Sequence, residues 1–86
     1  MYLVYILKSV KFRKTYTGIT DNLQRRLDQH NNGNSEYSSR YLPWEILYKE
    51  TVLDRNAARM RERYFKSAAG RRWIKRNLFN NFVRQS

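Results

Sequence analysis

A short run near the start of the chain, residues 2–7, carries apolar side chains at both alternate sets of positions. The run is rich in the aromatic and β-branched types that favour strands. Successive side chains of a strand point to opposite faces of the sheet, so a strand that is apolar on both faces needs cover on both. We therefore expect a strand packed on both sides, and the other elements have to supply that cover.

The residues that follow predict a hairpin and a helix. Residues 14–20 indicate a second strand, and the short basic connector at 8–13 favours antiparallel pairing. Asp21, with Gln24 three residues on, has the pattern of a capping box that opens a helix ending at about residue 31. The apolar stripe expected on this helix is Leu23, Leu27 and His30.

A loop and a third strand come next. Turn-forming residues at 32–35 and Pro43 near the far end predict a loop over residues 31–43. Residues 44–52 predict a strand in which two sets of side chains alternate. One set is Trp44, Ile46 and Tyr48, and the other is Glu45, Leu47 and Lys49.

The rest of the chain predicts two further helices. Asp54 is placed to cap a helix that runs through about Ala68, and Gly70 interrupts the chain before the next helix. The expected apolar stripes are Ala57, Met60, Tyr64 and Ala68 on the first helix and Trp73, Ile74 and Leu78 on the second, with Phe82 packing or fraying beyond. The order ββαβαα predicts an α/β or α+β fold with helices on a small, mostly antiparallel sheet. Its length suits one small domain, residues 1–86.

The chain carries a strong and uneven positive charge. Its formal net charge is +11, with 8 basic and 5 acidic residues (+3) in positions 1–50 and 10 basic and 2 acidic (+8) in 51–86. Such a field attracts a polyanion, nucleic acid first and an anionic membrane surface second, although solubility alone could account for part of it. The absence of cysteine excludes disulfides and thiolate metal sites. No apolar stretch has transmembrane length, so a cytoplasmic location is expected.

Four residues in the first part of the chain could act on a phosphodiester. Arg26 and His30 are four apart on the expected helix and project from one side of it. Tyr5 and Tyr16 lie on adjacent expected strands, where cross-strand side chains meet if the register permits. Each also has an ordinary role open to it: a core aromatic, a helix-end histidine, or an arginine whose stem covers apolar surface. The case for chemistry rests on the set.

Glu62 is one of only two acidic residues after position 50, and the other, Asp54, already has the role of helix cap. Glu62 could simply pair with Lys66 or Arg59 on its own helix. Alternatively, its carboxylate could hold a hard cation, since magnesium commonly takes one or two carboxylates together with water and substrate phosphate oxygens. Both alternatives stay open from the residues alone.

Taken in order, these segments resemble the GIY-YIG nuclease family, in particular the small stand-alone bacterial type related to the nuclease module of the excision-repair incision subunit. The resemblance extends over nearly the whole chain, and the order and spacing of its pieces make it specific. The pieces are residues 2–9, 16–23, 25–27, 30–31, 39–45 and 61–63. The resemblance implies a metal-dependent nuclease on a three-stranded antiparallel sheet flanked by helices.

The resemblance also implies roles for individual residues. The catalytic set that it implies is Tyr5, Tyr16, Arg26, His30 and Glu62, with Glu62 as the ligand of Mg²⁺ or of another divalent cation such as Mn²⁺. Arg26 rather than Arg25 matches the family arginine, because it lies four residues before His30. The cation and Arg26 would stabilise negative charge building on the phosphate, and either tyrosine or the histidine could accept the proton of the attacking water.

The expected partner is DNA, branched and single-stranded forms included, which arginine, lysine and exposed aromatic side chains would bind. The residues expected to bind it are Arg25, Tyr37, Arg40, Tyr41, Arg59, Arg63 and Lys66, whereas Trp44 is assigned to the core. We expect a DNA endonuclease of repair or processing, with no membrane association and with a protein partner as one source of specificity. The rivals are a catalytically weak or partner-dependent binding module with the same fold, and a small basic protein of an RNA particle.

Overall fold

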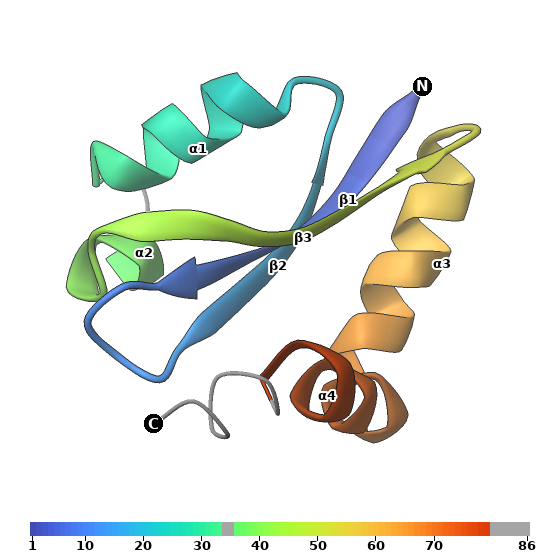
Figure 1. Cartoon of the computed structure of the whole chain (residues 1–86). Coiled ribbons are helices and arrows are strands. Elements are labelled where there is room, and N and C mark those ends of the chain that lie inside the picture. The colour runs from blue at the N-terminus through green and yellow to red at the C-terminus, as the bar shows by residue number, and fades with distance from the viewer. Residues whose placement is uncertain (34–35, 80–86) are drawn as a thin grey trace.

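The described part of the chain, residues 1–33 and 36–79 of a computed structural model, contains three strands packed with helices (Figure 1). The elements are β1 (Tyr2–Ser9), β2 (Thr15–Thr20), α1 (Leu23–Asn31), α2 (Glu36–Arg40), β3 (Trp44–Val52), α3 (Arg55–Lys66), α4 (Ala68–Ile74) and the π-helical turn η1 (Lys75–Phe79). The strands pair antiparallel in the order β2-β1-β3. The predicted α+β fold with a three-stranded antiparallel sheet is therefore confirmed. Asn34 and Ser35 of the predicted turn, and Phe82, lie outside the described residues.

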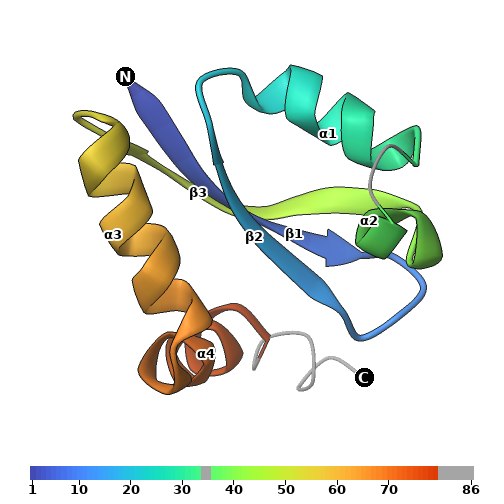
Figure 2. The same ribbon diagram turned by 180° about the vertical axis from the view of Figure 1, so that it is seen from behind.

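Strand β1 is the centre of the sheet and is covered on both faces, as its sequence predicts. Helix α1 lies on one side of the sheet, and α3 and α4 lie on the other (Figures 1 and 2). We call these sides the α1 face and the α3 face. The buried apolar residues are Val4, Ile6, Ala58, Phe65 and Ile74 on the α3 face and Tyr5, Leu7 and Trp44 on the α1 face. The alternation of β1 thus assigns each of its side chains to one of two separate cores.

Strand β3 has the predicted bounds but not the predicted alternation. Ile6 of β1 pairs with Tyr48, whereas Leu7 pairs with Ile46, so Leu47 has no partner in this ladder. Such a β-bulge changes the face to which the following side chains point. The tryptophan that opens the strand is buried on the α1 face, whereas Leu47 and Tyr48 pack on the α3 face. The expectation that positions 44, 46 and 48 share one face was therefore wrong.

Helix α1 spans the predicted residues but has a different cap. Asn22, not Asp21, is the N-cap, and its Oδ1 accepts a hydrogen bond from the backbone N–H of Arg25 at 3.1 Å. Asp21 instead forms an ion pair with the Arg25 side chain at 3.2 Å. Aspartate and asparagine are about equally good caps, so the sequence pattern alone could not separate two neighbouring candidates.

The predicted loop over residues 31–43 contains a short helix, α2. Arg40 pairs with Glu36 at 3.1 Å along this helix. The carbonyl of Ser38 accepts a hydrogen bond from the indole Nε1 of Trp44 at 2.8 Å, which fixes α2 against the start of β3. The loop prediction was wrong for this segment because a bond to a distant residue, rather than a local pattern, holds it in place.

Helix α3 begins at the predicted cap but buries a different face from the predicted stripe. The Asp54 carboxylate accepts a hydrogen bond from the backbone N–H three residues on at 2.9 Å. Met60 is 72% exposed, whereas Ala58 and Phe65 are buried. Between them Arg61 lays its guanidinium 4.7 Å from the centre of the Phe65 ring. A charged side chain therefore covers part of the core, which a count of apolar residues cannot anticipate.

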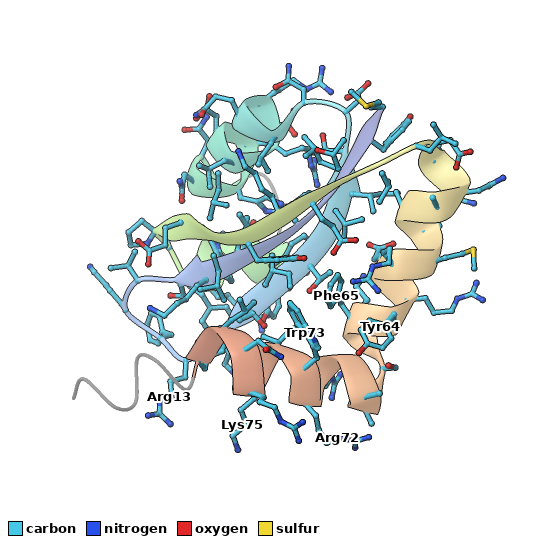
Figure 3. All side chains as sticks on the ribbon, turned by 45° about the vertical axis from the view of Figure 1, so that its right-hand side comes forward. Arg13, Tyr64, Phe65, Arg72, Trp73 and Lys75 are labelled. Carbon is cyan, nitrogen blue, oxygen red and sulfur yellow. The ribbon has the colours of Figure 1, made fainter. Side chains whose placement is uncertain are left out.

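Gly70 lies inside α4 and does not interrupt the helices. The break between α3 and α4 falls at Ser67, whose Oγ accepts a hydrogen bond from the N–H of Gly70 at 3.2 Å. A Cβ at position 70 would overlap the carbonyl oxygen of Tyr64 and lie 2.5 Å from the Cα of Phe65. The missing side chain therefore lets α4 fold tightly back onto α3, which places Trp73 beside Phe65 between the helices and the sheet (Figure 3).

We expect Gly70→Ala to lower the free energy of unfolding by about 1–3 kcal/mol, because the added methyl group overpacks the contact between the two helices. The loss should appear although alanine is favoured over glycine in a helix interior by about 1 kcal/mol. Urea denaturation followed by circular dichroism measures the change. Ala69→Ser, which adds one atom at an exposed position of the same helix, should change stability by less than about 0.5 kcal/mol. A Gly70→Ala protein as stable as the wild type would contradict the close packing.

Candidate active site

The α1 face carries a cluster of four predicted site residues from three elements. Tyr5 comes from β1, Tyr16 from β2, and Arg26 and His30 from α1. The Tyr5 hydroxyl lies 3.3 Å from His30 Nε2, and the ring centres of Tyr16 and His30 are 4.5 Å apart. The guanidinium of Arg26 lies close enough to both tyrosine hydroxyls for each of them to raise its pKa, and its Nη1 donates a hydrogen bond to Gln29 Oε1 at 2.8 Å. The structure thus brings these four side chains together.

Gly18 makes room for this cluster. It pairs directly with Tyr5 across the β1–β2 ladder, so both residues face α1. A Cβ at position 18 would overlap the Tyr5 hydroxyl, lie 2.6 Å from Cζ of that ring and lie 3.1 Å from Cε1 of Tyr16. The ring of Tyr5 therefore fills the space that a side chain at position 18 would occupy.

The Tyr5 hydroxyl is protonated at neutral pH. Burial raises the pKa of Tyr5 above its ordinary value of 10.0, and the hydrogen bond and positive charge of Arg26 offset this only in part. The nearby acidic groups of Tyr16 and Glu62 raise the pKa of Tyr5 further. Tyr5 is therefore better suited to hold its partners in place than to remove a proton from water.

His30 is neutral at neutral pH and orients the Tyr5 hydroxyl. It is only 2% exposed, and burial together with the charge of Arg26 lowers its pKa below the ordinary 6.5. Its Nδ1 is buried and has no hydrogen-bond partner among residues 1–33 and 36–79. A proton on Nε2 avoids an unpaired buried N–H at Nδ1, so we assign Nε2 as a donor to the Tyr5 hydroxyl.

The accessible part of the cluster is formed by Tyr16 and Arg26. Both side chains are half-buried, whereas Tyr5 and His30 are almost fully enclosed. The Arg26 guanidinium donates to Gln29 Oε1 at 2.8 Å and lies next to the Tyr5 hydroxyl, which His30 orients, so its position relative to the sheet is restricted. A ligand that approaches this face therefore meets a positive charge and a phenol hydroxyl in fixed positions.

Glu62 belongs to α3, in the layer on the opposite face of the sheet. Its carboxylate forms an ion pair with Lys66 at 3.2 Å. Together with Arg59 and Arg63, these residues surround an open depression of about 580 Å³. Unlike the other four members of the predicted set, Glu62 makes no direct contact with the cluster among the described residues. Its charge nevertheless reaches the cluster, because it contributes to the raised pKa of Tyr5.

The orientation of α3 points Glu62 toward the β2 edge of the sheet. Arg61 and Glu62 are neighbours on the helix and flank the buried line of Ala58 and Phe65 from its two sides. The Arg61 Nε donates to the Glu50 carboxylate at 2.7 Å, so that flank faces β3. The flank with Glu62 consequently faces the opposite edge, where Tyr16 and Gly18 lie.

The residues predicted to bind nucleic acid form two groups. Near the cluster, the Tyr37 ring lies 6.0 Å from Tyr16 and 5.1 Å from Tyr41, and Tyr37 is 39% exposed. Arg25 and Arg40 are exposed at the helices α1 and α2. The second group, Arg59, Arg63 and Lys66, surrounds Glu62 on α3. Trp44 is 3% exposed and lies in the core as predicted.

Sequence reasoning missed three side chains close to these groups. Phe12 in the connector after β1 is 48% exposed and contacts the Tyr41 ring at 5.5 Å. Lys14 lies over the same ring at 5.4 Å. Arg71 lines a cavity beside Tyr16. An aromatic residue between basic ones was the only signal for the connector, and nothing in the sequence separated Arg71 from its many basic neighbours.

Glu62 can hold a divalent cation only together with non-protein ligands. The described residues contain no group of three or more His, Cys, Asp or Glu side chains that could hold a metal ion. Magnesium keeps several waters and is often bound by one or two carboxylates plus substrate phosphates. A single carboxylate beside a basic surface fits that mode of binding, and it does not fit a metal enclosed by protein ligands.

Comparison with known proteins identifies one family and several similar proteins. Residues 1–77 match the family described as GIY-YIG catalytic domain. A UPF0213 protein of Clostridium perfringens is 40% identical over 67 residues, which cover 77% of this chain and 71% of that protein. A UPF0213 protein of Lactiplantibacillus plantarum is 38% identical over 68 residues, covering 76% and 66%. An uncharacterized protein of Acanthamoeba polyphaga mimivirus is 34% identical over 87 residues, which cover 95% of this chain but only 52% of that protein.

No solved structure matches the chain. None of the helices among the described residues is long and apolar enough to cross a membrane.

We expect Gly18→Ala to displace Tyr5 and to destabilise the fold by about 1–3 kcal/mol, because a methyl group at this position overlaps the tyrosine ring. A double-mutant cycle with Tyr5→Leu tests the cause. The shorter leucine frees the space, so the double variant should lose less stability than the two single variants combined. Urea denaturation of the four proteins gives the coupling energy. Strictly additive losses would show that the glycine and the tyrosine do not compete for this space.

The single histidine of the chain should titrate below pH 6.5. The pKa of the buried ring is lower in the folded than in the unfolded state, so the unfolded state takes up the proton first. Stability should therefore fall as the pH drops below about 6.5, until the folded ring is also protonated. Proton NMR of the imidazole measures the pKa directly. Arg26→Gln should raise it by removing the neighbouring charge, and a wild-type value at or above 6.5 would contradict the assignment.

Proposed function

The chain belongs to the GIY-YIG family, and from that premise we propose that it is an endonuclease that hydrolyses phosphodiester bonds of DNA. The observation that carries the proposal is the cluster of Tyr5, Tyr16, Arg26 and His30, which presents a fixed guanidinium and a phenol hydroxyl to solvent. Glu62 of α3 faces the β2 edge of the sheet from the α3 face, and it would complete the predicted catalytic set. The chain covers 71% and 66% of the length of two bacterial relatives. The proposal therefore rests on the family and on the cluster, and not on what those longer proteins do as a whole.

Each member of the cluster has a role that follows from its surroundings. Arg26 would stabilise the negative charge that develops on the non-bridging phosphate oxygens, because its guanidinium is held in place before the substrate arrives. Tyr16 carries the accessible hydroxyl, and we assign its deprotonated form, the phenolate, as the group that takes the proton from the attacking water. The phenolate, formed by prior loss of the hydroxyl proton to solvent, would have its negative charge next to the guanidinium of Arg26. Tyr5 and His30, both buried beside the guanidinium, help to hold it in position.

A divalent cation held by Glu62, such as Mg²⁺ or Mn²⁺, would supply further positive charge to the phosphate and to the leaving oxygen. Arg59, Arg63 and Lys66 surround that carboxylate and would bind flanking phosphates of the DNA. A role in DNA repair or processing, and a protein partner that supplies specificity, are part of the same proposal.

One observation favours a second candidate, a binding module with little activity of its own. Glu62 is already paired with Lys66, and a cation would have to replace that lysine. The pair is a surface ion pair of the kind usually worth less than about 1 kcal/mol, so replacing it costs little. We therefore place the nuclease first and the binding module second.

We expect Glu62→Gln to lower single-turnover cleavage of DNA by at least about 100-fold, since the charge stabilisation supplied by a bound cation amounts to several kcal/mol. DNA binding measured in parallel should stay the same or tighten slightly, because the glutamine removes a negative charge near the phosphates.

Glu36→Gln is the matched control for this variant. It makes the same chemical change and breaks the same kind of i,i+4 ion pair, with Arg40 on α2. Its cleavage rate should stay within about twofold of the wild type, because it lies outside the proposed metal site. Equal cleavage by the wild type and Glu62→Gln would reduce Glu62 to a partner of Lys66 and would remove the proposed metal site.

A further inference from the structure

A cavity of about 350 Å³ lies between β2, an outer strand of the sheet, and the corner formed by α3 and α4. Tyr16 of the cluster forms part of its wall, so the cavity begins where the candidate active site ends. Tyr37 and Lys66, which the sequence predicts to bind DNA, also line it, and the structure adds Arg71 and the buried Phe65 and Ile74. Its volume falls at the lower end of the range for small-ligand pockets, which suits one nucleotide.

The aromatic wall of the cavity is held in a fixed position. Tyr16 and Tyr37 both line it, and their ring centres lie 6.0 Å apart. The Tyr37 hydroxyl donates to the carbonyl of Thr15 at 3.2 Å, which ties its ring to the end of β2. Phe65 and Ile74, both nearly fully buried, add apolar surface to its lining. Such a surface suits the planar face of a base, which stacks on aromatic side chains in a sequence-tolerant way.

Two cations also line the cavity, Lys66 of α3 and Arg71 of α4. Among the described residues, no carboxylate lies within ion-pair distance of the Arg71 side chain. Lys66 also borders the depression around Glu62, with its Nζ 3.2 Å from that carboxylate. The cavity is therefore joined through Lys66 to the position at which the proposed cation would bind.

We propose that this cavity binds one nucleotide of the DNA strand next to the bond that is cleaved, with its phosphate on Lys66 and Arg71 and its base against Tyr16 and Tyr37. Two cations that share a single carboxylate partner, Glu62 on Lys66, match a phosphate, and two aromatic rings together with buried apolar residues match a base. The inference rests on the proposed function because it identifies the occupant as part of a DNA substrate. It extends that function by naming Arg71 as a residue that positions the strand.

The neighbouring arginine provides a matched control. Arg71 and Arg72 are both exposed and lie next to each other on α4, but only Arg71 lines the cavity. In Figure 3, Arg72 and Lys75 extend from the side of the helices that faces away from the sheet. Substitution of either arginine removes one charge from the same helix, so a general effect of net charge would be equal for both.

The test is a titration of the isotope-labelled protein with thymidine monophosphate, followed by NMR in the presence of EDTA. We expect the amide signals of Thr15, Thr17 and Ile74 to shift in the wild type. Arg71→Gln should weaken binding about 10-fold, as for the loss of one charge-assisted contact to a phosphate. Arg72→Gln should change binding by less than about twofold, and Arg71→Lys should restore most of the affinity. Equal losses in Arg71→Gln and Arg72→Gln would overturn the proposal.

Two further ligands separate the parts of the nucleotide. Thymidine, which lacks the phosphate, and inorganic phosphate, which lacks the base, should each bind more weakly than thymidine monophosphate. Inorganic phosphate that binds as tightly as the nucleotide would overturn the role of the two rings. Because EDTA removes divalent cations and no bond is cleaved, these measurements do not depend on nuclease activity. If the wild type cleaves DNA but thymidine monophosphate does not bind in this cavity, only this inference is contradicted. If the nucleotide binds but no DNA is cleaved, only the proposed function is contradicted.

Discussion

The central strand β1 is buried on both faces, and the rest of the structure follows from that constraint. Its alternation divides the protein into two cores, with Tyr5 and Leu7 on one face and Val4 and Ile6 on the other. A hydroxyl buried in an apolar core has to be hydrogen-bonded, because an unpaired one costs about 1–3 kcal/mol. His30 meets this need at Tyr5, and the positive charge of Arg26 lies beside the same hydroxyl. The polar cluster is therefore as much a condition for covering β1 as it is a candidate for chemistry.

The second core sets the direction of α3, and a charged pair holds that direction. Arg61 binds the Glu50 carboxylate through Nε and Nη2 at 2.7 and 3.1 Å, and the Tyr48 hydroxyl donates to the same carboxylate. The hydrogen bonds from Arg61, and to a lesser extent the one from Tyr48, lower the pKa of Glu50. The Arg61–Glu50 pair is therefore charged at neutral pH. A bidentate pair fixes the rotation of a helix better than apolar contacts, which are not directional. The rotation in turn places Glu62 at the β2 edge.

The sequence predicted the parts of the fold that depend on local patterns, and it missed those that depend on partners far along the chain. The three strands, α1 and the Asp54 cap follow from periodicity and capping preferences that any local segment displays. The bulge at Leu47, the helix α2 and the exposure of Met60 depend on contacts across the molecule. For the candidate site, spacing along the chain identified the residues that the structure brings together on the α1 face. The lining by Arg71 could not be predicted, because charge composition does not indicate where a side chain points.

The lone carboxylate of Glu62 follows from the charge balance that a site for a polyanion requires. Two unit charges 4 Å apart interact by about 4 kcal/mol at the effective dielectric of a protein surface, so each added carboxylate would repel an approaching phosphate appreciably. Glu62 is surrounded by Arg59, Arg63 and Lys66, which outnumber it and leave the local charge positive. One carboxylate thus offers a ligand for a cation without reversing the attraction for DNA. The same balance explains why Lys66 can border both Glu62 and the cavity beside Tyr16: it offsets the carboxylate on one side and offers a charge to phosphate on the other.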